Sequence, residues 1–269
     1  MKISFKRAGA VLYRHIFYLT KPFEIFHYWY WILIDILIFG FLGKSFCQAA
    51  SAANGACISN VHILFTNLVL LYAFLRTTTT FGVSFLRDLW DANFVNLFST
   101  PIKKVEWLLG ILWMATISAT LCVCIGTFLV RIIFGFSILV FGWYIPLVLV
   151  LLITTGTIIG TLMMGVLLLL GKQANPLIWA IGWLFIPISG VYYSPDVLPP
   201  LLKACTAYNP LFSIFSIIRQ VGTGNTDIWP LVLHSILLMV PLAIAVALFF
   251  AYAFSVAKKH GLTRLEVEM

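Results

Sequence analysis

Six long apolar stretches run through this chain of 269 residues, and they constrain its fold more than any other feature. A helix that crosses a bilayer needs about 20 consecutive, predominantly apolar residues. Six stretches meet that requirement: 25–43, 61–81, 107–134, 143–170, 176–192 and 228–256. We therefore predict an all-α integral membrane protein with six transmembrane helices.

The composition agrees with a lipid environment. Hydrophobic residues make up 62% of the chain and charged residues 10%, whereas soluble domains have roughly 45–50% and 25%. A soluble fold of this length could not bury so much apolar surface. The net charge of +8 is not gathered into a basic patch with interleaved aromatic residues, so no nucleic-acid partner is expected.

The distribution of Lys and Arg predicts the orientation. If the N-terminus is cytoplasmic, 13 of the 17 basic residues fall on the cytoplasmic side, in residues 1–24, 76–106, 257–269 and at Lys172. The other four fall on the outer side. Basic residues concentrate in short cytoplasmic loops, so both termini are predicted to be cytoplasmic.

Residues 1–22 have the pattern of an amphipathic helix that lies on the membrane surface. Five apolar residues fall on one arc and five cations on the other. The apolar set is Phe5, Ala8, Leu12, Ile16 and Leu19, and the cations are Lys2, Lys6, Arg7, Arg14 and Lys21. Pro22 should end this helix, ahead of a transmembrane domain at 23–258 and a cytoplasmic tail at 259–269.

Two polar segments between the predicted spans carry further patterns. Segment 83–105 predicts a short cytoplasmic helix that stops at Thr100-Pro101, and it is either a docking surface or a solvated connector. Segment 193–227 is apolar but is broken by Pro199-Pro200 and Asn209-Pro210 into pieces of roughly 8–12 residues, too short to span. It is either a re-entrant helical pair or an external loop.

Few ionisable residues fall inside the predicted spans, where charge is costly and usually functional, and Asp35 and Arg76 are the two candidates. Asp35 is near the middle of the first span, and Arg76 is near the cytoplasmic end of the second. They could neutralise each other as a pair. Alternatively, Asp35 makes a structural hydrogen bond and Arg76 extends to the headgroups.

Tryptophans near the predicted span ends are typical of an interfacial belt. They are Trp29, Trp31, Trp107, Trp143 and Trp229. Aromatic rings also stack on sugars, so they point weakly to a glycan. Cys47 and Cys57 share a predicted outer loop, where they form either a disulfide or two free thiols.

The sequence shows no catalytic motif. No H-E-x-x-H or G-x-S-x-G occurs, and five Asp and four Glu are too scattered to hold magnesium. The nearest approach to a nucleotide-binding loop, Gly171-Lys172-Gln173, lacks the upstream glycine and the Ser or Thr that binds magnesium. We expect a non-catalytic subunit without a cofactor of its own.

Two regions of the chain carry more specific motifs, namely FVNLFSTPIKKVEWLLG and ISGVYYSPDVLPPLLKACTAYNPLFSIFSIIRQVGTG. They resemble the ABC-2 type transporter permease family, the first being similar to the coupling segment of that family and the second to its outer segment. The matching residues are Leu97, Thr100, Pro101, Glu106 and Gly110 in the first region, and Ser189, Gly190, Val191, Tyr192, Tyr193, Leu198, Pro199, Pro200, Asn209, Pro210, Arg219 and Gly222 in the second. Where the family often has Arg-Glu ahead of its coupling helix, this chain has Arg87-Asp88.

The resemblance implies the type-2 ABC exporter fold and a permease subunit in the bacterial inner membrane. It implies a homodimer with two copies of a separate ATPase subunit, which binds ATP and Mg, and a glycan, lipid or hydrophobic drug as cargo. ATPase coupling would involve Arg87, Asp88, Trp90, Asp91, Phe94, Leu97 and Pro101. The outer gate would involve Tyr192, Tyr193, Pro199, Pro200, Asn209, Pro210 and Arg219. An ATP-independent secondary transporter and a membrane scaffold subunit are the alternatives.

Overall fold

The computed structural model describes residues 4–19, 22–49, 56–91, 97, 99–193 and 195–259, and this part of the chain is helical without a strand. The prediction of an all-α protein is therefore confirmed for the described residues. The helices are α1 (Phe5–Leu19), α2 (Pro22–Ala49), α3 (Ala56–Trp90), α5 (Lys104–Phe134), α6 (Tyr144–Leu170), α7 (Asn175–Leu184), α8 (Pro200–Thr206), α9 (Pro210–Gly222) and α10 (Trp229–Lys259). Short 3₁₀ turns lie at Ile138–Phe141, Gly171–Ala174 and Pro195–Val197.

Four helices of the described chain are long and apolar enough to cross a membrane: α3, α5, α6 and α10. They correspond to the second, third, fourth and sixth predicted spans, and α2 covers the first. The bent pair of α8 and α9 would make a fifth crossing if it were one broken span. The ends of α5, α6 and α10 agree with the prediction to within three residues.

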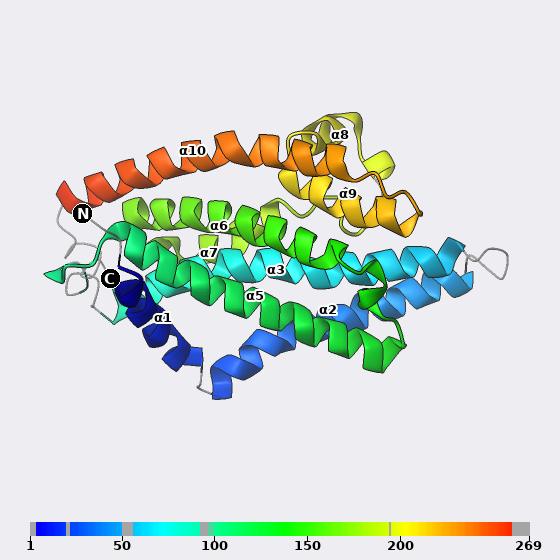
Figure 1. Ribbon diagram of the computed structural model, residues 1–269, viewed down its shortest axis with the longest axis horizontal. Coiled ribbons are helices and arrows are strands. Elements are labelled where there is room, and N and C mark those ends of the chain that lie inside the picture. Colours follow the sequence, from blue (N-terminus) through cyan, green and yellow to red (C-terminus); the bar gives the residue numbers. More distant parts are fainter. Residues whose placement is uncertain are drawn as a thin grey trace.

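Helix α3 is the central element of the bundle, and α10 lies on its flank (Figure 1). In the most apolar window of α3, 89% of the residues are buried, against 22% for α10. Helices α2, α5, α6, α7 and α9 all pack against α3. The outward face of α10 exposes a stripe of large apolar side chains, including Leu237, Ile244 and Leu248, as expected of a surface that contacts lipid.

Helix α3 is longer than predicted. The sequence suggested a span at 61–81 and then a separate helix within 83–105, but α3 continues without a break to Trp90. Its last turns carry Phe85, Leu86 and Leu89, which are buried in an apolar cluster with residues of α1, α5 and α6. Tertiary packing of these side chains stabilises the helical extension more than local polarity disfavours it.

The fifth predicted span, 176–192, is not one continuous helix. Helix α7 ends at Leu184, after ten residues, or about 15 Å, which is half the thickness of a bilayer core. Turns follow from Phe185 to Tyr193. Pro187 explains the break, because it has no N–H to donate and it disfavours helical geometry at the residue before it.

The predicted N-terminal helix forms as α1, and it packs against α5. Ala8, Val11 and His15 form its buried face, and Phe5 stacks on Trp113 with ring centroids 6.2 Å apart. Figure 1 shows α1 beside the start of α5, at the end of the bundle opposite to α8 and α9. We call the region formed by α1, the last turn of α3 and the first turn of α5 the α1 end.

Candidate functional site

The α1 end contains a buried carboxylate, that of Asp88 in the last turn of α3. It is 0% exposed. Arg14 of α1 donates to one oxygen at 2.5 Å, and the indole N–H of Trp107 in α5 donates to the other at 3.1 Å. Three helices therefore meet at one carboxylate. Trp107 is itself fully buried, so its assignment to an interfacial belt was wrong.

A second buried carboxylate, Glu106, lies in the first turn of α5. It accepts the backbone N–H of Ser4 at 2.8 Å and that of Lys103 at 3.0 Å. Arg7 of α1 pairs with it at 3.5 Å and also donates to the carbonyl of Pro101. The bond from Lys103 is half of a capping box, and the contacts from α1 tie the start of that helix to the start of α5.

Next to these buried carboxylates, the α1 end exposes an aromatic and an acidic side chain in succession. Trp90 is 55% exposed, and Asp91 follows it on the surface. Thr100 and Pro101, which precede α5, are also exposed. An exposed indole beside a carboxylate suits contact with another protein.

The other predicted coupling residues are distributed differently. Arg87 is half-buried, and Leu97 is half-buried against the apolar cluster at this end. Phe94 lies outside the described residues. The structure thus brings Asp88 inward and leaves Trp90, Asp91 and Pro101 on the surface. Sequence reasoning had assigned Asp88 and Asp91 the same role.

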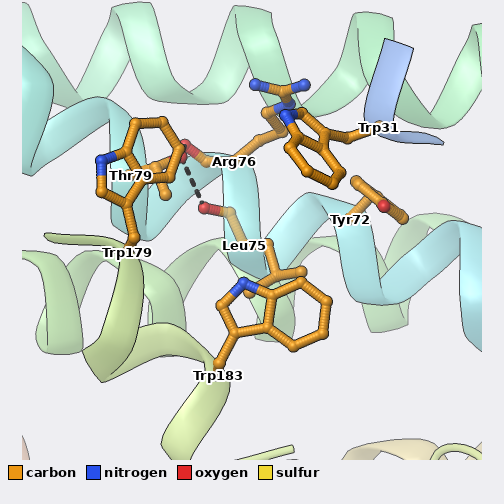
Figure 2. A pocket seen from close by; sticks show the side chains of 7 residues that line it. All are labelled: Trp31, Tyr72, Leu75, Arg76, Thr79, Trp179 and Trp183. Atoms are coloured by element: carbon orange, nitrogen blue, oxygen red, sulfur yellow. Dashed lines mark hydrogen bonds between the residues drawn. The ribbon is translucent and has the colours of Figure 1, made fainter. Parts of the chain in front are cut away.

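A pocket of about 380 Å³ lies near the middle of the bundle, between α2, α3 and α7. Its lining residues are Trp31, Tyr72, Leu75, Arg76, Thr79, Trp179 and Trp183. Figure 2 shows the indoles of Trp179 and Trp183 one above the other on α7, with Trp31 across from them beside Arg76. The pocket therefore combines three aromatic walls with a cationic side chain.

Arg76 lies halfway along α3, whereas the sequence predicted it near the end of a span that stopped at residue 81. It is 14 residues before Trp90, or about 21 Å at 1.5 Å per residue. That distance is longer than an arginine side chain, so Arg76 does not reach the end of the helix. The guanidinium lies near the Cys122 thiol of α5.

Asp35 of α2 has a different partner from the one proposed in the sequence analysis. The Tyr72 hydroxyl donates to its carboxylate at 2.5 Å, which agrees with the alternative of a structural hydrogen bond. Tyr72 precedes Arg76 by one turn of α3, so Asp35, Tyr72 and Arg76 form a polar layer at mid-height. Neither Trp179 nor Trp183 was singled out from the sequence, although their spacing of four places both on one face of a helix.

The predicted outer-gate residues gather at the end opposite α1. Arg219 of α9 donates to the carbonyl of Gly190 at 2.7 Å, and Gly190 has a φ of 66°, which favours glycine. Asn209 caps α9 through Leu211 N–H and donates to the Phe185 carbonyl at 3.2 Å. These contacts link the broken end of α7 to α9.

The prolines and tyrosines complete this region. Pro200 and Pro210 occupy the first turns of α8 and α9, after Pro199 and Asn209, and the two helices meet at 86°. Tyr193 donates to the Pro187 carbonyl. Tyr192 stacks on Phe39 of α2, with ring centroids 4.5 Å apart. A helical pair with this bend is the geometry expected of a re-entrant segment.

A second pocket, of about 330 Å³, lies between this region and α3. It is lined by Asn67, Tyr192, Arg219 and their neighbours. Within the described chain, three buried atoms of these side chains make no hydrogen bond: Asn67 Oδ1, Tyr192 Oη and Arg219 Nε. Incomplete pairing of this kind is rare in folded proteins and calls for a functional or conformational explanation.

The described residues hold no group of three His, Cys, Asp or Glu side chains that could share a metal ion. Cys47 and Cys57 lie outside the side chains that the structure describes. Neither the models of known protein families nor the curated proteins contain a match to this chain. The candidate functional regions of the described chain are the α1 end, the mid-bundle pocket and the α8–α9 region.

Proposed function

We propose that the chain is the transmembrane permease subunit of an ATP-driven exporter of the ABC-2 type. Two copies would line a path for a glycan, lipid or hydrophobic drug, and each would dock on a separate ATPase subunit. The chain would lie in a bacterial inner membrane with both termini in the cytoplasm. In that orientation the α1 end faces the ATPase, and α8 and α9 lie on the outer side.

The observation that carries the proposal is the structure of the α1 end. Trp90 and Asp91 are exposed, and they lie two and three residues after Asp88, which binds α1 and α5 at once. A force applied to Trp90 and Asp91 would therefore be transmitted to α1, α3 and α5 together. Rigid-body movement of packed helices is a common way to amplify such a small displacement.

In the proposed cycle, closure of the ATPase dimer moves the α1 end, and the α8–α9 region opens on the outer side. Trp90 would supply apolar anchorage to the ATPase, and Asp91 a hydrogen-bond or ion-pair partner. Asp88 would act inside the subunit by transmitting the movement to α1 and α5. This role replaces the direct ATPase contact that the sequence suggested for it.

The test is purification of the tagged chain together with its ATPase, followed by transport and ATPase assays in proteoliposomes. Trp90→Ala should weaken association with the ATPase at least about tenfold, as truncation of an anchoring tryptophan usually does. Asp91→Ala should have a smaller effect. Trp143→Ala is the matched control, because Trp143 is also 55% exposed and lies before α6 at the other end of the bundle. Equal loss in both tryptophan variants would contradict the docking surface.

Topology offers an independent test. In a background without the native cysteines, Ser99→Cys should react with a membrane-impermeant thiol reagent in opened cells and not in intact ones. A variant that retains Cys205 alone should react in intact cells, because Cys205 is exposed on α8. The opposite pattern would place the α1 end outside and exclude an ATPase partner there.

A secondary transporter is the second candidate, and the polar layer of Asp35, Tyr72 and Arg76 favours it. Charged groups inside a bundle often belong to ion or substrate pathways. Transport by the purified chain alone, driven by an ion gradient, would establish this alternative. Transport that requires the ATPase and ATP would exclude it.

A further inference from the structure

We propose that the mid-bundle pocket binds an amphiphile with an acidic headgroup. Arg76 would hold the acid, and the indoles of Trp31, Trp179 and Trp183 would hold the uncharged body of the molecule. The inference deepens the proposed function and rests on it in one respect, namely that the bound molecule is the cargo. The binding site itself follows from the charge, the shape and the position of the pocket.

Arg76 occupies a buried position inside the bundle. The residue is 7% exposed and lies in the middle of the central helix. A guanidinium stays charged under all physiological conditions, and a charge at this depth is costly and usually functional. Its five N–H groups can bind a phosphate or a carboxylate through two parallel hydrogen bonds.

The charge of the lining selects the sign of the ligand. Among the described residues that line the pocket, Arg76 is the one with a full charge. Tyr72 donates its hydroxyl proton to Asp35, and Thr79 donates to the carbonyl of Leu75 at 2.8 Å (Figure 2). A cationic ligand would be attracted by the indole faces but repelled by the guanidinium. An acid is favoured by both the charge and the geometry.

The shape of the pocket indicates a molecule larger than the acid group. A volume of about 380 Å³ is typical of small-molecule sites. The three indoles are 43–48% exposed, so they form an open mouth on the flank of the bundle and not a closed chamber. A ligand could place its acid on Arg76 and extend an apolar or ring-bearing portion out along the indoles. That arrangement describes an amphiphile.

The pocket is preformed because α7 is held close to α3. A Cβ added at Gly182 of α7 would lie 3.2 Å from Leu75 of α3, so the two helices are in close contact between Trp179 and Trp183. Ile178, the neighbour of Trp179, is fully buried against α3 and α6. These contacts fix the two indoles relative to Arg76, and preorganised aromatic walls lower the entropic cost of binding.

The test measures binding to the full-length chain in nanodiscs of neutral lipid, by tryptophan fluorescence and calorimetry. Dodecyl phosphate and dodecyl maltoside have the same alkyl chain but different headgroups. Dodecyl phosphate should bind at least about tenfold more tightly, since one charge-assisted pair contributes about that much. Inorganic phosphate tests whether the anion alone suffices, and it should bind far more weakly than dodecyl phosphate.

Substitutions test whether the preference for dodecyl phosphate over dodecyl maltoside arises in this pocket. Arg76→Gln should remove the preference for dodecyl phosphate, and Arg76→Lys should keep part of it. Trp179→Leu and Trp183→Leu should weaken both dodecyl probes. Arg131→Gln, which removes an exposed cation from the last turn of α5, and Trp143→Leu are the controls and should change neither affinity.

Three results would overturn the inference: equal binding of both headgroups to the unaltered chain, equal binding of inorganic phosphate, or an undiminished preference in Arg76→Gln. The first two are measured without a substitution and so do not depend on the folding of a variant. The assay contains no ATPase. Failure to bind the acid therefore contradicts this inference alone, whereas failure to couple with an ATPase contradicts the proposed function alone.

Discussion

The two ends of the bundle both bury polar groups but satisfy them differently. At the α1 end, the carboxylates of Asp88 and Glu106 are fully buried and bind α1 through Arg14, Arg7 and the Ser4 N–H. At the α8–α9 end, Arg219 and Asn209 make hydrogen bonds, but four buried side-chain atoms make none within the described chain. These atoms are Asn67 Oδ1, Tyr192 Oη, Arg219 Nε and Gln220 Oε1.

This difference indicates which end is rigid and which can rearrange. A satisfied buried network resists opening, because each broken bond leaves a charged or polar group without compensation. A partly satisfied network has less to lose when it opens to water or ligand. We infer that the α1 end moves as one body and that conformational change in the chain is easiest near α9, as the proposed function would require.

Removal of Asp88 should have the largest effect on stability. Asp88→Ala leaves Arg14 and the Trp107 indole without their shared acceptor, and breaking a buried pair in this way costs about 3 kcal/mol. Asp196→Ala is the control at the other end. It removes an ion pair with Lys203 of similar length, 2.8 Å, but both side chains are more than half exposed, so the loss should stay below about 1 kcal/mol.

Denaturant unfolding of the purified chain, followed by helical circular dichroism, measures both variants. Asp88→Asn sharpens the comparison, because its amide oxygen can still accept from Trp107 while the ion pair with Arg14 is lost. It should fall between Asp88→Ala and the unaltered chain. If Asp88→Ala and Asp196→Ala lost the same free energy, the α1 end would not be the more strongly bonded region.

The sequence predicted the helices well where apolar runs decide them, and less well where long-range contacts do. The ends of α5, α6 and α10 follow from local composition. The last nine residues of α3 do not, because Phe85 and Leu89 are helical through burial by distant helices. The early end of α7 was signalled by Pro187, yet the apolar residues around it were interpreted as continuing the span.

The same contrast between local and long-range signals applies to the candidate site residues. Pro199 and Asn209 could be placed at breaks between short helices from the local sequence alone, whereas Arg219 was grouped with them only through the resemblance to the ABC-2 permease family. The pairing of Asp88 with Arg14 joins residues 74 positions apart, and nothing in the spacing of either residue indicates it. Trp179 and Trp183 show their common face through a spacing of four, but Trp31 comes from another helix and joins them only through the packing of α2 on α3.

His15 is an exception at the α1 end and predicts a pH dependence. It is 2% exposed, and neither ring nitrogen has a hydrogen-bond partner in the described chain. Burial, with smaller contributions from the charges of Arg14 and Arg87, lowers the pKa of His15 to about 4, below its usual value of about 6.5. Between these two values the unfolded chain binds a proton that the folded chain does not. Stability should therefore fall as the pH falls through that window.

At pH 5.5 the loss attributable to His15 should be on the order of 1 kcal/mol relative to pH 7.5. The unfolding free energy of the unaltered chain minus that of His15→Gln, measured at both pH values, isolates this contribution from other titrating groups. A difference that is independent of pH would mean that His15 is not held neutral at the α1 end.

The smallest effect is expected from Tyr192→Phe, and it tests the other half of the comparison. The Tyr192 hydroxyl is buried without a partner in the described chain, while its ring stacks on Phe39. Phenylalanine keeps the stacking and removes the unsatisfied oxygen, so stability should stay the same or rise by less than about 1 kcal/mol. Tyr72→Phe is the matched substitution, because the Tyr72 hydroxyl donates to Asp35, and it should cost about 1–2 kcal/mol. A loss in Tyr192→Phe equal to that in Tyr72→Phe would show that the α8–α9 end satisfies its polar groups as well as the rest of the bundle, and it would no longer be the region that opens most easily.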